Sequence, residues 1–336
     1  MAGPGELPPQ AQIMQGIFGF MVTKCMSAVA AHRIPDALKD GPLYYTDLAE
    51  KTGTDQRALH RMMRMLSGIG IFSEPEPGKY ALTPASELLR TDVPGSMHGM
   101  AVMITSDSHW QPWGRMEEVL KTGASGPQHA FGTDLFTWFQ HDDNKDQWEM
   151  FNVAMSSFSS GIAHAVAESI DFSGFKHIVD VGGGHGYFLK TLLEKAPEAK
   201  GTLFDLPQVV EGASDLGDRI QREGGDFFKS VPGGGDCYTL KHIIHDWSDE
   251  QCVTILKNIG EVMDPNGKVM VAELVMPEGN QPHPAKFMDV NMLAMTEGGC
   301  ERTEAEYAEL FSKAGLKLNG IHPTPSPVSV VEAIKG

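Results

Sequence analysis

The chain has 336 residues, of which 41% are hydrophobic, and a formal net charge of −17 at pH 7. This length exceeds one ordinary domain and suits two. The negative charge argues against a polyanionic partner such as nucleic acid or an anionic membrane. No stretch of about eighteen apolar residues occurs, so no membrane-spanning helix is expected. Four scattered cysteines without a C-x-x-C pair, and a start without a basic segment, predict a cytoplasmic protein with free thiols.

The first predicted elements are helical. Residues 11–40 carry an apolar run that glycines interrupt, which predicts a buried helix. Two shorter helices are expected to begin near Thr46, the predicted N-cap of the first, and near Thr54. Strand-like runs at 71–74 and 79–82, separated by a turn with Pro and Gly, predict a β-hairpin. Helix, turn, helix and hairpin in this order are typical of a winged helix.

A winged helix raises the possibility of DNA binding. Arg57, Arg61 and Arg64 follow one another at helical spacing and share one face. Residues 1–100 nevertheless hold nine Lys or Arg against ten Asp or Glu, whereas a DNA-binding module should be clearly basic. The sequence therefore favours a solvated face or interfacial ion pairs for these arginines.

The next region, residues 96–170, is expected to be helical and is rich in aromatic residues. Phe151, Met155 and Phe158 recur at the spacing of one helical stripe. Such a stripe is typical of a core. Its place directly before the glycine-rich segment described next also favours a pocket wall, so both interpretations stay open.

That segment is the most informative part of the sequence. The apolar run 177–179 leads into Asp180 and then Gly182, Gly184 and Gly186, before a helix-like segment. Strand, glycine-rich turn and helix in this order form the first βα turn of a Rossmann-like sheet, where a helix N-terminus faces a ligand. The G-x-G-x-G spacing differs from the G-x-G-x-x-G of dinucleotide sites. With an acidic residue at the strand end, it suits S-adenosylmethionine better than NAD.

Two later segments could complete a nucleoside site. Asp205, followed by Leu206, ends the next strand-like run about twenty residues on, where a carboxylate can accept both ribose hydroxyls. Asp226 offers a carboxylate for an adenine amine, and Phe227 offers an aromatic ring to cover the base. These residues extend the predicted cofactor site.

Three further segments carry a resemblance to a known family. They are the block His245-Asp246-Trp247, the strand-like run 269–273 that ends in Glu273, and the run 298–303 around Glu301. With the glycine-rich loop, their order and spacing resemble the small-molecule O-methyltransferase family, which includes plant caffeate and flavonoid, animal acetylserotonin and bacterial natural-product enzymes. The resemblance covers essentially the whole chain.

The resemblance implies roles for many residues. His245 is expected to be the general base, with Glu273 and Glu301 as the carboxylates that orient its imidazole. The N-terminal domain is expected to form a homodimer. Cofactor-side positions are expected at Lys241, Trp247 and Ser159, and substrate-side positions at Asp246, Met288 and Met292 in addition to the aromatic stripe.

The acceptor chemistry follows from the base. A phenol with a pKa near 10 needs help to lose its proton, whereas a carboxylate acceptor needs no base. The sequence therefore predicts methyl transfer to a hydroxyl of a small aromatic compound. His242 beside His245 could suggest a metal pair, but no further ligand cluster supports one, and no metal is expected. The alternatives are a nicotinamide-dependent oxidoreductase and a winged-helix regulator that binds the cofactor without catalysis.

The expected architecture is α/β, with a Rossmann-like class I methyltransferase domain behind a helical, winged-helix dimerisation domain. The predicted boundaries are 1–95 for the dimerisation domain, 96–170 for a helical linker with the substrate pocket, and 171–336 for the catalytic domain. No nucleic acid or membrane partner is expected.

Overall fold

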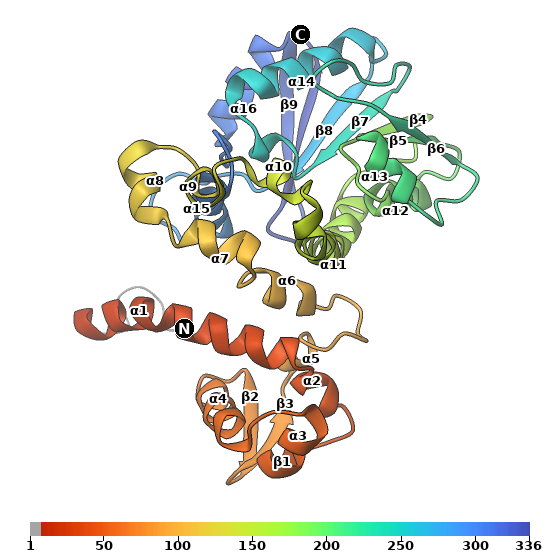
Figure 1. Ribbon diagram of the computed structural model, residues 1–336. Coiled ribbons are helices and arrows are strands. Elements are labelled where there is room, and N and C mark those ends of the chain that lie inside the picture. Colours follow the sequence, from red (N-terminus) through yellow and green to blue (C-terminus); the bar gives the residue numbers. More distant parts are fainter. Residues whose placement is uncertain (1–7) are drawn as a thin grey trace. The chain divides into compact units, whose positions relative to one another are not determined.

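The computed structural model describes residues 8–336, except for the side chains of residues 156–159 (Figure 1). The chain divides into two compact units. The first runs to Trp110 and includes Phe139–Phe158, and the second comprises Gln111–Trp138 and Ser159–Gly336. The domain boundaries expected from the sequence stay a prediction.

The first unit begins with helices around a small antiparallel sheet of strand order β1-β3-β2. The predicted hairpin is confirmed, because β2 and β3 pair directly. In chain order the elements are α1 (Pro9–Ala31), α2 (Ile34–Ala37), β1 (Leu43–Tyr44), α3 (Tyr45–Thr52), α4 (Gln56–Gly68), β2 (Phe72–Glu76), β3 (Lys79–Leu82), α5 (Pro84–Glu87) and α6 (His98–Met103).

Local sequence explains the start of α4 but not that of α3. The Asp55 side chain caps α4 by accepting a hydrogen bond from the Ala58 backbone N–H at 2.8 Å. The predicted cap Thr46 is wrong, because α3 already begins at Tyr45. The Tyr45 N–H donates to the Gly78 carbonyl of the hairpin at 2.9 Å, so a tertiary contact replaces a side-chain cap.

Helix α1 is apolar but largely uncovered. Ile13, Ile17 and Phe20 are 67%, 53% and 52% exposed, and burial begins only at Ser27, where α1 packs on α4 and α6. The expected buried helix is therefore not found within the single chain. By length and composition α1 could cross a membrane, a test that core helices of soluble proteins also pass.

The next elements in chain order are helices. They are α7 (Asp107–Trp113), α8 (Met116–Thr122), α9 (Gly126–Phe131), α10 (Leu135–Phe139), the 3₁₀ turn η1 (Asp142–Asn144) and the long α11 (Lys145–Ser169). Within the first unit, Phe139, Trp148 and Phe151 form an aromatic cluster with ring centroids 5.3–5.9 Å apart. This cluster confirms the aromatic, helical character expected for the region.

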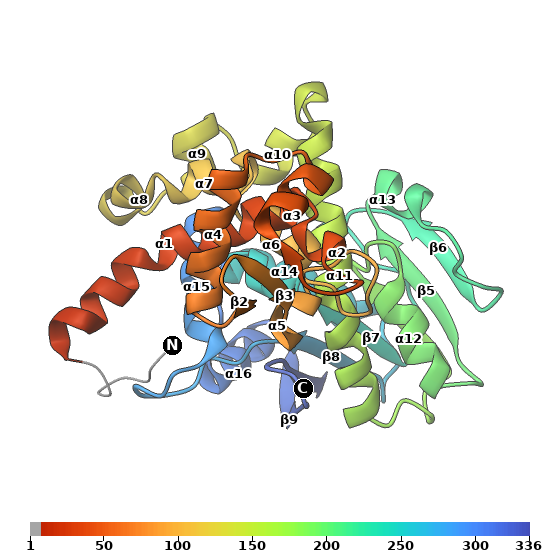
Figure 2. The ribbon, with the colours of Figure 1, turned by 90° about the horizontal axis from the view of Figure 1, so that it is seen from below.

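The second unit contains a seven-stranded sheet of order β6-β5-β4-β7-β8-β10-β9, with β6 and β9 at opposite edges (Figure 2). Its first five strands in chain order are parallel, and β10 runs antiparallel to both of its neighbours. The strands are β4 (His177–Val181), β5 (Lys200–Asp205), β6 (Ile220–Gly224), β7 (Cys237–Lys241), β8 (Lys268–Glu273), β9 (Leu316–Pro323) and β10 (Ser329–Lys335).

Helices cover both faces of this sheet, with α12 and α13 on one side and α14 and α16 on the other (Figure 1). The strands are nearly continuous apolar runs because both faces are buried. The helices are α12 (Tyr187–Lys195), α13 (Pro207–Gly212), the 3₁₀ turn η2 (Ile244–Asp246), α14 (Asp249–Val262), α15 (Pro284–Met295) and α16 (Glu304–Lys313). The predicted Rossmann-like fold is thus confirmed.

The parallel strands bring their polar ends to one edge of the sheet. Asp205, Lys241 and Glu273 are the last residues of β5, β7 and β8, and Asp180 is the penultimate residue of β4. Ligands in open α/β sheets bind at this carboxyl edge, beside the strand where the order reverses. Here that strand is β4, which lies between β5 and β7.

Candidate active site

The turn between β4 and α12 begins with Gly182, Gly183 and Gly184, a stretch of backbone without side chains that we call the cofactor ledge. A Cβ atom on Gly182 would lie 2.5 Å from the Ile243 side chain, and one on Gly183 would lie 2.6 Å from the Asp180 carboxylate. A Cβ on Gly184 would meet no atom within 4 Å, although this residue has a φ of +58°. Gly184 is therefore the point of the loop where a ligand can approach the backbone.

Asp180 supplies a buried carboxylate beneath this ledge. Its Oδ1 atom accepts a hydrogen bond from the Thr239 hydroxyl at 2.7 Å, and its Oδ2 atom has no partner among the described residues. Burial raises the pKa of Asp180 to about 6, while the Thr239 hydrogen bond and the charge of Lys241 oppose that rise. An unsatisfied buried acceptor of this kind fits the ammonium end of S-adenosylmethionine.

Asp205 ties the end of β5 to the same ledge. Its two carboxylate oxygens accept the backbone N–H groups of Gly184 at 2.8 Å and Leu206 at 2.7 Å. Burial raises its pKa, although these hydrogen bonds oppose the rise. A carboxylate has about four acceptor sites, so two remain for a pair of ribose hydroxyls.

The predicted adenine-side residues lie beside an aromatic group. Asp226 accepts the Phe228 N–H at 3.0 Å and pairs with Lys229 at 3.2 Å, so its carboxylate already takes part in a local turn. The Trp247 ring has the Phe227 and Phe228 rings edge-on at 5.9 and 4.8 Å. The rings of Phe227, Phe228 and Trp247 therefore form one aromatic wall, and Trp247 directly follows the last residue of η2.

His245 lies in η2 and is buried. Its Nδ1 atom is 2.7 Å from the Glu301 carboxylate, and its Nε2 atom is 3.6 Å from the Asp246 carboxylate. Burial alone would lower the pKa of His245, but the charges of Asp246, Glu301 and Glu273 together raise it to about 9. Burial raises the pKa of Glu301, and its bond to His245 opposes that rise.

Glu273 holds the backbone of this turn rather than the imidazole. Its Oε1 atom accepts the N–H groups of Ile243, Ile244 and His245 at 3.1, 2.7 and 3.2 Å. Its Oε2 atom accepts the hydroxyl of Tyr307 at 2.5 Å. The resemblance assigned both carboxylates to the imidazole, whereas in the structure only Glu301 contacts the ring.

Lys241 connects the two ends of the site electrostatically. Its ammonium lies 5.9 Å from the centre of the Phe188 ring. Burial lowers its pKa, and the charges of Asp180 and Asp246 oppose this effect. Lys241 therefore interacts with a carboxylate of the cofactor ledge and with a carboxylate beside His245.

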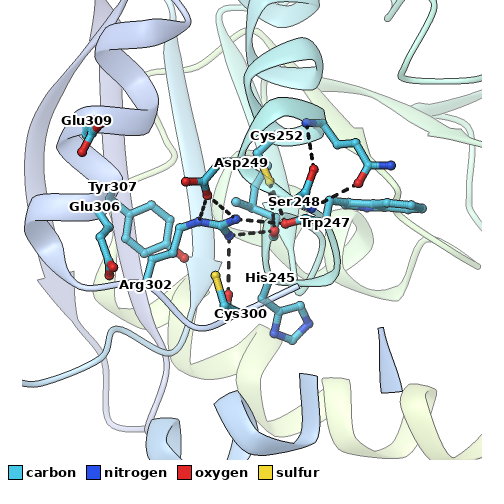
Figure 3. Close-up of polar contacts among 12 residues, drawn as sticks. His245, Trp247, Ser248, Asp249, Cys252, Cys300, Arg302, Glu306, Tyr307 and Glu309 are labelled. Atoms are coloured by element: carbon cyan, nitrogen blue, oxygen red, sulfur yellow. Dashed lines mark hydrogen bonds and ion pairs between the residues drawn. The ribbon is translucent and has the colours of Figure 1, made fainter. Parts of the chain in front are cut away.

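Arg302 is a residue whose role the sequence did not indicate. Its side chain is 2% exposed and pairs with Asp249 at 2.8 Å (Figure 3). It also donates to the carbonyls of Ile244 at 3.0 Å and Trp247 at 2.9 Å. These carbonyls lie 58 and 55 residues away in the chain and carry no side-chain signature, so no motif could have indicated the contacts.

The predicted substrate residues fall in both units. Phe151 and Met155 belong to the first unit. The side chain of Phe158, and that of the predicted cofactor residue Ser159, lie outside the described side chains. On α15, Met292 is buried and the Met288 sulfur is 3.8 Å from the Asn291 amide. Their pocket roles stay predictions.

Helix α15 also holds the segment that carries Glu301. The Asp289 carboxylate accepts the backbone N–H of Glu301 at 3.0 Å, which the sequence did not indicate. In the part of the chain that the structure describes, no group of three or more His, Cys, Asp or Glu could hold a metal ion. The buried groups at the sheet edge thus fit a nucleoside cofactor and a proton acceptor.

Comparisons with known proteins agree with this geometry. Residues 14–92 match the O-methyltransferase dimerisation domain, and residues 113–317 match the O-methyltransferase domain. The phenazine O-methyltransferase PhzM of Lysobacter antibioticus is 37% identical over 335 residues, which are 98% of this chain and 97% of the relative. The 3-amino-4-hydroxybenzoate 4-O-methyltransferase of Streptomyces cremeus is 36% identical over 330 residues, 96% of this chain and 89% of the relative.

A solved structure, that of human N-acetylserotonin methyltransferase in complex with S-adenosylmethionine, aligns with a TM-score of 0.90 at 27% identity. The alignment covers 100% of both chains. These matches set aside the nicotinamide-dependent oxidoreductase and the non-catalytic regulator. The chain belongs to the O-methyltransferase family and is an S-adenosylmethionine-dependent O-methyltransferase.

Proposed function

We propose that this enzyme methylates a hydroxyl group on a small aromatic compound and that His245 is its general base. One observation carries the proposal: the 2.7 Å contact between His245 Nδ1 and Glu301. In the neutral imidazole this contact favours the proton on Nδ1, since a carboxylate accepts only. The lone pair of Nε2 is then free to take a proton.

The chemistry requires such a base. Bound S-adenosylmethionine supplies an electrophilic methyl group on a positively charged sulfur. A phenol with a pKa of about 10 is a poor nucleophile until its proton leaves. His245 Nε2 takes this proton as the oxygen attacks, and Glu301 stabilises the imidazolium that forms. Positioning of the oxygen in line with the methyl group supplies much of the remaining rate.

The acceptor class is drawn from the relatives and the aromatic wall. The relatives' names mention a phenazine, an aminohydroxybenzoate and N-acetylserotonin, all of them aromatic. In this chain the rings of Trp247 and Phe136 are stacked, with their centroids 6.4 Å apart. Trp247 is two residues after His245 in the sequence. Flat rings of a phenol, hydroxyindole or hydroxyphenazine suit such a wall.

The test is a panel of aromatic hydroxyl compounds with radiolabelled S-adenosylmethionine. In His245→Gln we expect the catalytic rate on the best acceptor to fall by roughly two to four orders of magnitude, without a loss of cofactor affinity. His322→Gln is the control, because His322 lies on edge strand β9 and pairs with Glu332 at 3.5 Å. A nitrophenol of similar shape should depend less on His245, because it arrives ionised.

Two results would overturn this proposal. If His245→Gln methylates an ordinary phenol at the wild-type rate, His245 is not the base. If an aromatic amine or a carboxylate is methylated while every hydroxyl fails, the acceptor class is wrong.

We also propose a homodimer in which the apolar face of α1 packs against a second copy. The dimerisation match begins within α1, and Ile17 and Phe20 are large, exposed apolar residues there. Light scattering should give a dimer for the wild type and a monomer for Ile17→Glu combined with Phe20→Glu. Leu120→Glu is the control, because Leu120 is 85% exposed on α8 in the second unit. This proposal would be contradicted if the wild type were monomeric and fully active. It would also be contradicted if a monomeric wild type bound anionic vesicles through α1.

A further inference from the structure

We infer that Arg302 is a positioning residue that fixes the distance between His245 and Glu301 by binding backbone carbonyls on both segments. This inference rests on the proposed role of His245 as the base. Arg302 is not expected to touch the cofactor or the acceptor.

The contacts of the guanidinium reach both segments (Figure 3). Nη1 donates to the carbonyl of Ile244, the residue before His245, at 3.0 Å, and Nη2 donates to that of Trp247 at 2.9 Å. Nη1 also lies 3.4 Å from the carbonyl of Cys300, the residue before Glu301. One rigid side chain therefore spans the turn that carries the imidazole and the loop that carries its carboxylate.

The opposite side of the turn is held by an anion. Glu273 accepts the N–H groups of residues 243–245, so the turn lies between a carboxylate on its N–H groups and a guanidinium on its carbonyls. The Cys252 thiol also donates to the Ile244 carbonyl at 3.1 Å. Because η2 has only three residues and little hydrogen bonding of its own, these side chains determine where the imidazole lies.

The chemistry of arginine suits this task. Its planar fork of five donors reaches several carbonyls at once, whereas a lysine ammonium is a single point that cannot cover the same set. The buried charge is balanced by Asp249, whose Oδ1 atom accepts from Nε at 3.0 Å and from Nη2 at 2.8 Å. Asp249 is itself 59% exposed, so its replacement opens no cavity in the core.

The decisive variant is Arg302→Lys, which keeps the charge and removes the fork. Misplacement of a reacting group by about 1 Å can cost roughly 100-fold in rate. We therefore expect kcat to fall by roughly 10- to 100-fold, with KM within about twofold of wild type and no weakening of cofactor binding. Arg219→Lys is the matched control, because Arg219 donates to the carbonyls of Leu193, Ala196, Pro197 and Ala199, away from His245. It should leave kcat unchanged.

A second readout does not depend on activity. The imidazole of His245 faces the carboxylates of Asp246, Glu301 and Glu273 and lies 5.0 Å from the His242 ring. If Arg302→Lys lets Glu301 move away, the NMR-measured pKa of His245 should fall toward its ordinary value, and Arg219→Lys should not change it. Asp249→Asn should give the same effects more weakly, and it serves if Arg302→Lys does not fold.

The outcomes separate this inference from the proposed function. A lowered His245 pKa with unchanged kcat would keep Arg302 as a positioning residue and would refute the role of His245 as base. An unchanged pKa in both Arg302→Lys and Asp249→Asn would overturn the inference. An equal loss of activity in Arg302→Lys and Arg219→Lys, in step with lost thermal stability, would also overturn it.

Discussion

The raised pKa of His245 leads to a prediction about the charge of the cofactor. At a pKa of about 9 the imidazole of the free enzyme is protonated at pH 7, and a protonated imidazole cannot act as a base. S-adenosylmethionine carries a positive sulfonium, while its product S-adenosylhomocysteine does not. Because a nearby positive charge disfavours the imidazolium, the cofactor should lower the pKa of His245 and the product should not.

The size of this effect follows from the reaction geometry. A base about 3 Å from the acceptor oxygen, and an oxygen about 3 Å from the methyl carbon, place the sulfur within about 8 Å of Nε2. Two unit charges at about 8 Å interact by about 2 kcal/mol at an effective dielectric constant near 20. This energy corresponds to a pKa of His245 lowered by about 1.5 from its value in the free enzyme.

The assay is NMR titration of histidine-labelled enzyme with each ligand at saturation. The chain has 13 histidines, so the His245 signal is assigned by its absence from the spectrum of His245→Gln. We expect a pKa of about 9 with S-adenosylhomocysteine and a clearly lower pKa, by about 1.5, with S-adenosylmethionine. With S-adenosylmethionine saturating, the rate at limiting acceptor should accordingly rise with pH only up to this lowered pKa, because the acceptor meets the cofactor-bound enzyme. Equal pKa values with the two ligands would refute the reasoning, since the sulfonium would then lie too far from His245.

Two further predictions concern the cofactor ledge. Asp205→Ala should weaken S-adenosylmethionine binding by roughly 2 kcal/mol, about 30-fold in Kd, because it removes the ribose acceptor and leaves the Gly184 N–H unpaired. Calorimetry measures this Kd, and an unchanged value would count against the assignment. Gly184→Ala should raise the Kd for S-adenosylmethionine by roughly tenfold or more, whereas Gly315→Ala should leave it unchanged. Gly315 is the control because both glycines have positive φ and open space around a Cβ. Equal effects of the two substitutions would show that backbone strain alone is responsible.

The sequence predicted the fold well because its signals are local. Strand, glycine-rich turn and helix around Gly182–Gly186 lie within one short segment, and their spacing specifies a parallel βα unit. The hairpin of β2 and β3 was equally local. Helix α1 was harder, because whether its apolar face is covered depends on a surface outside the single chain.

The contacts that hold His245 and Glu301 in place could not be predicted for a different reason. Arg302, Tyr307 and Asp289 act on backbone groups or on another side chain that is distant in sequence. A backbone carbonyl or N–H is the same at every position, so its partner leaves no pattern in the sequence. Glu301 and Arg302 are neighbours of opposite charge, yet folding sends one side chain to the imidazole and the other to Asp249.

The different contacts of the two glutamates predict a loss of activity for one substitution and a loss of stability for the other. Glu301→Gln keeps the size of the side chain that faces Nδ1 but removes its charge, so the pKa of His245 should fall and kcat should drop by roughly 10- to 100-fold. Glu273→Gln removes the charge that three backbone N–H groups and the Tyr307 hydroxyl share. It should destabilise the fold by about 2 kcal/mol or more, since buried donors lose a charged acceptor.

Thermal unfolding and the pH–rate profile distinguish the two roles. Glu301→Gln should keep its melting temperature and lose the pH dependence of wild type, whereas Glu273→Gln should lose several degrees of melting temperature. Its His245 pKa should change less than that of Glu301→Gln, because Glu273 influences the ring through charge without a hydrogen bond to it. If Glu273→Gln instead melts like wild type and changes the pH profile as strongly as Glu301→Gln, both carboxylates act on the imidazole directly. The assignment of Glu301 to the imidazole ring and of Glu273 to the backbone would then be wrong.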